Sequence, residues 1–151
     1  MSLLRTDTQA ALQALHKVIR ESAAHYRFVV EHCARGEGAK RCDELAEERD
    51  QLAGQLAEAI RKTGDLPAEP DRDLEAARQL QDELVSQLSG LFDENGAAAM
   101  IEHCQQMERQ LQTVVQEDAA VLSGSDHESL RGACADSAER ARRILDEIVS
   151  G

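Results

Sequence analysis

The sequence predicts an all-α protein, built as a four-helix bundle with one additional crossover helix. Two observations support this prediction. Aromatic residues make up only 2% of the chain, and the residues between apolar positions are mostly Ala, Glu, Gln, Arg and Leu, the strongest helix formers. Apolar residues also recur every three or four positions, which marks one face of a helix, whereas no segment alternates as a strand would. With 151 residues, the chain fits a single domain, 1–151.

Turn and capping residues divide the chain into five expected helices. Thr6 and Gln9 are spaced as a capping box ahead of the first helix. Gly36 and Gly38 can end that helix and form a turn, and Gly64 can end the second helix. The expected helices span 7–35, 39–63, 73–92, 97–122 and 127–149, and a linker that contains both prolines spans 64–72.

Two polar segments set the later boundaries. The sequence DENG at 93–96 is expected to break the chain before the fourth helix, and SGSD at 123–126 forms a short turn with a good N-cap. Short turns make antiparallel hairpins of the first two and of the last two helices. The helix at 73–92 can carry the chain back along the bundle, so the second and fourth helices would run parallel. This is the one-crossover arrangement of ferritin-like bundles.

Each expected helix carries one continuous stripe that should face the core. The stripes of the first two helices are Leu12, Leu15, Ile19, Ser22, Tyr26, Val29, Cys33 and Cys42, Leu45, Arg49, Leu52, Leu56, Ala59. Those of the last two are Ile101, Cys104, Glu108, Leu111, Val115, Asp118, Leu122 and Leu130, Cys134, Ser137, Ala141, Ile144, Ile148. The helix at 73–92 spreads its apolar residues over more than one face, which makes it the expected dimer surface. These residues are Leu80, Leu84, Val85, Leu88, Leu91 and Phe92.

Several of these segments resemble an uncharacterised, stress-associated bacterial family of ferritin-like domains, whose own function is unknown. The resemblance spans most of the chain and rests on ALQALHKVIRES, AAHYRFVVEHC with Tyr26, LAEERDQLAGQL with Arg49 and Leu56, Gly64 with Pro67, and, more loosely, EHCQQMERQLQTVVQED with Cys104 and Glu108. It implies a ferritin-like four-helix fold and supplies no activity.

The charge balance narrows the choice of partners. Lys and Arg total 17 against 29 for Asp and Glu, and the net charge of −12 repels phosphate backbones and anionic membrane surfaces. Nucleic acid and membranes are therefore not expected as partners. The first residues lack the apolar segment of a signal peptide, and no stretch is apolar enough to span a bilayer, so a cytoplasmic location is expected.

A ferritin-type di-iron centre is not expected. Such a centre needs a Glu-x-x-His pair on two of its helices, and no Glu in this sequence has a His three residues later. We therefore expect no cofactor. The five histidines, which we expect at surface or boundary positions, are His16, His25, His32, His103 and His127. A weak cation site made of carboxylates alone stays open.

A charged residue interrupts the second stripe at Arg49, and charged side chains are rare in a core line unless they are paired. At about 1.5 Å of rise per residue, Arg49, Glu108 and Tyr26 fall at nearly one level, with Ser137 and Glu139 expected nearby. We predict a structural polar layer of Tyr26, Arg49, Glu108 and Ser137, with an inward ion pair between Arg49 and Glu108. In the alternative, Arg49 extends to the surface and its stem covers the stripe.

The four cysteines are too widely spread for a disulfide framework, and free thiols are expected. Cys33, Cys42 and Cys104 occupy stripe positions near one end of the bundle, and Cys134 lies toward the other end. We expect them to pack as small apolar residues. A thiolate metal site or a redox switch is the alternative.

The favoured function is a non-enzymatic bundle that acts as a homodimer or by binding a protein partner. No nucleophile with a base, no phosphate-binding glycine loop and no Ser-His-Asp arrangement can be identified, so an enzyme is not expected. Two alternatives stay open. One is an acidic helical chaperone. The other is a metal-binding or oxidative-stress protein that uses Glu48, Glu108, Asp118 and Glu139.

Overall fold

The computed structural model describes residues 4–32, 36–67, 94–124 and 126–150. These residues form four helices and no strand. The helices are α1 (Asp7–His32), α2 (Glu37–Lys62), α4 (Glu94–Leu122) and α5 (Glu128–Ser150). The predicted all-helical class is therefore confirmed for this part of the chain. The expected helix at 73–92, with its proposed dimer surface, and most of the linker at 64–72 lie outside the described residues.

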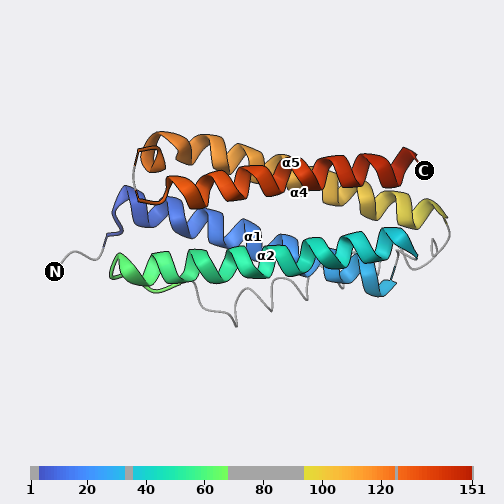
Figure 1. Ribbon diagram of the computed structural model, residues 1–151, viewed down its shortest axis with the longest axis horizontal. Coiled ribbons are helices and arrows are strands. Elements are labelled where there is room, and N and C mark those ends of the chain that lie inside the picture. The colour runs from blue at the N-terminus through green and yellow to red at the C-terminus, as the bar shows by residue number, and fades with distance from the viewer. Residues whose placement is uncertain (1–3, 33–35, 68–93, 125, 151) are drawn as a thin grey trace.

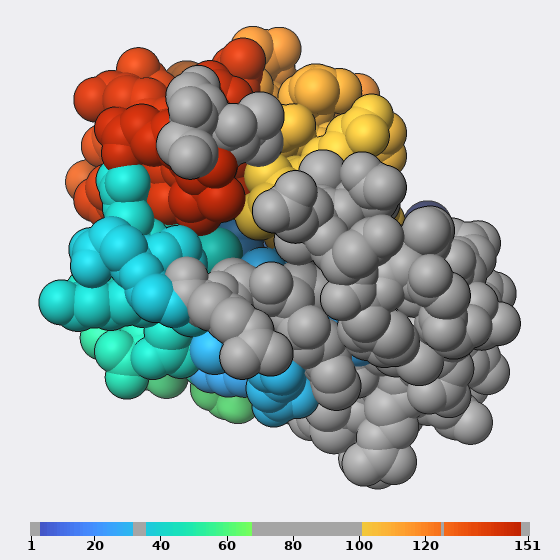
Figure 2. Space-filling view, turned by 90° about the vertical axis from the view of Figure 1, so that its right-hand side faces the viewer, coloured from blue at the N-terminus to red at the C-terminus, as the bar shows by residue number. Residues whose placement is uncertain are grey.

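The four helices form a bundle in which each helix has two neighbours. α1 packs against α2 and α4, and α5 packs against α4 and α2. The colours of Figure 1 show that all of these neighbours run antiparallel, whereas α2 and α4, on one diagonal, run in the same direction. In the end-on view of Figure 2, α5 lies beside α4 and over α2. The parallel direction of α2 and α4 agrees with the sequence prediction, while the crossover itself lies outside the described residues.

The capping box at the start of α1 is present as predicted. The Thr6 backbone N–H donates to Oε1 of Gln9 at 2.9 Å, and the Gln9 N–H donates to Oγ1 of Thr6 at 3.1 Å. Gln9 Nε2 also donates to the carbonyl of Thr63 at 3.1 Å. One residue therefore caps α1 and ties its first turn to the end of α2.

Two predicted boundaries near glycines are wrong. α2 begins at Glu37 and includes Gly38, because Gly36 alone supplies the left-handed turn, with φ 65°. α4 begins at Glu94, three residues before the expected start at 97, so Glu94, Asn95 and Gly96 are helical. An acidic residue is favourable in the first turn of a helix, where the backbone N–H groups carry partial positive charge. Gly64, with φ 89°, follows the end of α2 as expected.

The predicted stripes of α1, α2 and α4 form the core, which divides into two apolar clusters. One cluster surrounds Leu15, Leu56 and Leu111, and the other surrounds Tyr26 and Leu45. Asp118 is only half-buried, and Cys33 lies outside the described residues.

On α5 the predicted stripe is partly wrong. The buried residues of α5 are Cys134, Ser137, Ala138, Ala141 and Leu145, whereas the predicted Leu130, Ile144 and Ile148 are half-buried. The buried strip of a helix is set by the helices it packs against, and α5 contacts both α4 and α2.

Candidate functional site

A polar layer separates the two apolar clusters, and all four described helices contribute to it. Ser22 comes from α1, Arg49 from α2, Glu108 from α4 and Ser137 from α5, and each lies between apolar residues of both clusters along its own helix. The Arg49 and Glu108 side chains are both 0% exposed. Arg49 therefore does not extend to the surface, and the alternative reading of the sequence is wrong.

Every N–H donor of the Arg49 guanidinium has an acceptor inside the bundle. Nη1 donates to Oε2 of Glu108 at 3.0 Å and to Oγ of Ser22 at 3.0 Å. Nη2 donates to Oε1 of Glu108 and, at 3.2 Å, to the carbonyl of Ser137. Nε donates to Oγ of Ser137 at 2.8 Å. A guanidinium has five N–H donors in a planar fork, so none is left over.

The predicted ion pair between Arg49 and Glu108 is thus present, as a two-pronged pair in which each carboxylate oxygen accepts one bond. Burial raises the pKa of Glu108, and the adjacent charge of Arg49 opposes that rise. Tyr26 completes the layer, with its ring centroid 5.8 Å from the centre of the guanidinium. The Tyr26 hydroxyl lies where it favours the charged form of Glu108, although it has no hydrogen-bond partner. Burial raises the pKa of Tyr26 well above 10.

The carboxylates of the metal-binding alternative are not brought together. Glu108 is held by Arg49, Glu48 pairs with Arg140, and the exposed Glu139 pairs with Arg143 at 3.1 Å. Asp118 is half-buried on α4, and burial raises the pKa of its carboxyl to about 6. Within the described residues, no three His, Cys, Asp or Glu side chains are grouped so that they could hold a metal ion.

The expectation that all five histidines lie at surface or boundary positions is wrong for His16 and His25. His16 and His25 are buried, with 4% and 6% of their surface exposed, whereas His103 and His127 are half-buried. The side chain of His32 lies outside the described residues. The rings of His25 on α1 and His103 on α4 meet, with centroids 4.9 Å apart.

The described cysteines are all buried, as expected for small core residues. Cys42 and Cys134 are free thiols, and burial raises the pKa of each to about 11. Thiols with such a high pKa are almost entirely protonated at neutral pH, and the thiolate is the reactive form. Cys104 is buried in the same cluster as Cys42. These environments support a packing role over a reactive one.

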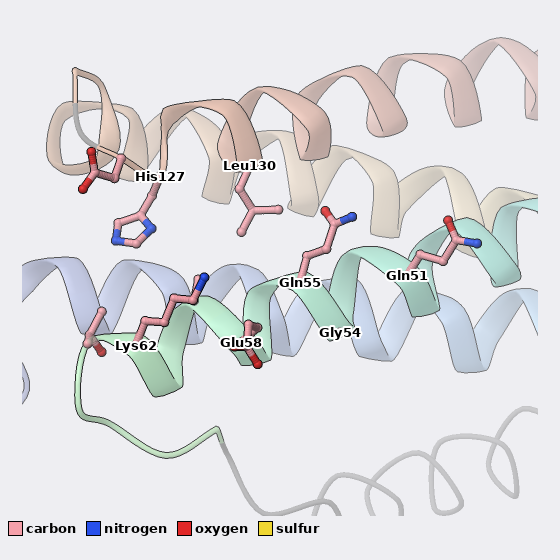
Figure 3. Close-up of a pocket in the computed structure, with 10 residues that line it drawn as sticks. Gln51, Gly54, Gln55, Glu58, Lys62, His127 and Leu130 are labelled. Atoms are coloured by element: carbon pink, nitrogen blue, oxygen red, sulfur yellow. The ribbon is translucent and has the colours of Figure 1, made fainter.

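A groove of about 900 Å³ runs between α2 and the start of α5 (Figure 3). Polar residues line it on both sides: Gln51, Gln55, Glu58 and Lys62 come from α2, and Asp126 and His127 come from the turn before α5. Leu130 of α5 points toward α2 from the opposite wall. The sequence does not predict this groove, because the groove depends on the distance between α5 and α2.

Comparison of the chain with protein-family models, with curated proteins and with solved structures found no match. In the described part of the chain, no helix is long and apolar enough to cross a membrane.

Proposed function

We propose that this protein is a non-enzymatic, ferritin-like helical bundle that acts by self-association or by binding a protein partner. The observation that carries this proposal is the closed polar layer. Its five donor hydrogen bonds are all satisfied within the chain, at side chains that are buried from solvent. A buried guanidinium whose five donors are all used inside the chain has none left for a substrate.

In this proposal the guanidinium of Arg49 stands where a metal-binding bundle would hold its cations, and its positive charge neutralises Glu108. Such a layer also specifies the fold. A slip of α2 or α4 by one turn would leave a buried charge without its partner, and a slip of α1 or α5 would leave donors of Arg49 without acceptors. Either slip is more costly than a shift between apolar side chains. The layer therefore supports a rigid scaffold that binds its partners through its outer surfaces.

The groove between α2 and α5 is the described surface that we assign to a protein partner. Side-chain amides and charges of both signs line it, and these groups hydrogen-bond readily to a polar segment. We place the protein in the cytoplasm of a bacterium, on the resemblance to the stress-associated family and on the free, protonated thiols of Cys42 and Cys134.

Two experiments test the proposal. Sedimentation velocity of the full chain over a hundredfold concentration range should show a reversible dimer if the protein self-associates. For a partner, a photo-crosslinking residue replaces Gln55 in the groove, and the matched control replaces the exposed Gln110 on α4. Crosslinks to one defined protein in the source cells at position 55 alone are expected. A strictly monomeric chain that gives the same crosslinks at both positions contradicts the proposal.

A further inference from the structure

His25 and His103 form a second polar cluster, on the side of the bundle where α1 packs against α4. His25 is only 6% exposed. Its Nδ1 lies 2.7 Å from the carbonyl oxygen of Glu21, one turn earlier on α1. Because a carbonyl can only accept a hydrogen bond, Nδ1 carries the proton. The lone pair of the neutral ring is therefore on Nε2.

Both Nε2 atoms are buried and have no hydrogen-bond partner in the structure. Buried polar side-chain atoms are nearly always paired in native proteins, and an unpaired acceptor costs free energy. The contrast with Arg49 is direct, since every donor of that side chain is satisfied. Packing alone does not explain why two adjacent rings, from two different helices, each keep a buried nitrogen without a hydrogen bond.

The surroundings of both rings favour the neutral form, in which one nitrogen of each ring carries a lone pair. Burial lowers the pKa of His25, and burial together with the neighbouring His25 lowers the pKa of His103. Both shifts favour the neutral imidazole, which is the form that coordinates a metal ion. The hydrogen bond from Nδ1 of His25 to a backbone carbonyl is also the usual outer contact of a metal-binding histidine, since it fixes the tautomer and the ring orientation.

We propose that Nε2 of His25 and Nε2 of His103 bind one late divalent transition-metal ion, of the zinc and copper class, and that water, which reaches the half-buried side chain of His103, fills its remaining positions. Imidazole is a preferred ligand of these metals. Two imidazoles on one tetrahedral ion, at metal–nitrogen distances of about 2.0–2.1 Å, place their ring centroids about 5 Å apart. The observed separation is 4.9 Å.

This site is independent of the proposed scaffold function and differs from a di-iron centre. It lies beside the bundle axis, and it contains none of the four carboxylates considered above. No third His, Cys, Asp or Glu of the described residues joins the pair. With two ligands from the protein, the affinity should be well below that of a structural zinc site with four.

Equilibrium dialysis of the full chain against Zn²⁺ at pH 7.5 tests the site. One Zn²⁺ per chain should be retained at micromolar free metal, and His25→Gln and His103→Gln should each weaken binding at least about tenfold. His127→Gln, which changes a histidine in the groove between α2 and α5, should leave binding unchanged. Equal Zn²⁺ binding by the parent and by both pair variants would overturn the proposal, and so would no retention at millimolar Zn²⁺.

A spectroscopic readout on the parent protein guards against variants that fold poorly. Long-range ¹H–¹⁵N spectra report each ring nitrogen separately. Addition of Zn²⁺ should shift Nε2 of both His25 and His103 while Nδ1 of His25 stays protonated. A shift confined to other histidines would place the metal elsewhere and refute the assignment.

Discussion

The polar layer around Arg49 and the pair of His25 and His103 are both buried polar clusters, yet they differ in whether their polar atoms have hydrogen-bond partners. All five donors of Arg49 find acceptors from three other helices, whereas each histidine keeps a buried nitrogen with no partner. A closed cluster of this kind fixes how the helices are aligned, because each polar group needs its partner. The histidine pair keeps two ring nitrogens without hydrogen bonds, and these can bind a ligand.

The largest expected effect comes from breaking the closed layer. Arg49→Ala or Glu108→Ala should each lower the free energy of unfolding by roughly 3–5 kcal/mol, because the remaining charge would be buried without its partner. Urea denaturation followed by circular dichroism measures the change. The control is Arg140→Ala, which removes a surface ion pair with Glu48 and should cost about 0–1 kcal/mol.

Removing both charges sharpens the same comparison. Arg49→Met combined with Glu108→Leu should be at least as stable as the parent, since apolar replacement of a buried ion pair is often neutral or stabilising. A loss under about 1 kcal/mol in both single variants would contradict the buried pair, because a stranded buried charge costs several times that.

An intermediate effect is expected at Ser137. Ser137→Ala leaves Nε of Arg49 without its acceptor, and an unsatisfied buried donor should cost about 1–3 kcal/mol in thermal or urea unfolding. Ser129→Ala, at an exposed position of α5, should stay within about 0.5 kcal/mol of the parent. Equal losses in the two variants would mean that Arg49 does not depend on this bond.

The smallest effect on stability is expected at His25 and His103 in the metal-free protein. His25→Leu removes both the unpaired buried acceptor and the hydrogen bond from Nδ1 to Glu21, and because these losses have opposite effects, stability at pH 7.5 should change by less than about 1 kcal/mol. The pKa values of His25 and His103 are lowered in the folded state, so the unfolded chain takes up protons first as the pH falls. Their contribution to stability is complete above 6.5 and is lost as the pH falls through the folded-state pKa.

The urea concentration at the midpoint of unfolding, measured between pH 7.5 and pH 5, tests this loss of stability with falling pH. The parent should lose more stability over this range than His25→Leu, and His127→Gln should follow the parent. The same pH dependence in all three proteins would show that the pair does not remain neutral in the folded state.

Much of the fold and of the polar layer could be predicted from the sequence. The stripes of α1, α2 and α4 are read from periodicity, and the pairing of Arg49 with Glu108 follows from a constant rise per residue along helices of known direction. The capping box is equally local. Its two bonds join residues three apart, so their geometry depends on one turn of helix.

The histidine pair was missed although a signal was present. His25 and His103 each directly precede a stripe residue, Tyr26 and Cys104, at the same end of the bundle. A position beside the stripe can face solvent or a neighbouring helix, and periodicity does not distinguish the two. The same limit explains why Leu145 of α5 is fully buried and the predicted Ile144 is not.

The sequence by itself therefore determined the helical class, most of the core-facing residues and the buried pairing of Arg49 with Glu108. These depend on spacing along a single helix and on the cost of an unpaired buried charge. Only the tertiary structure decided the rotation of α5, the groove beside it and the meeting of His25 with His103. Those depend on which flanks of different helices come together, and this is settled by the packing of the whole bundle.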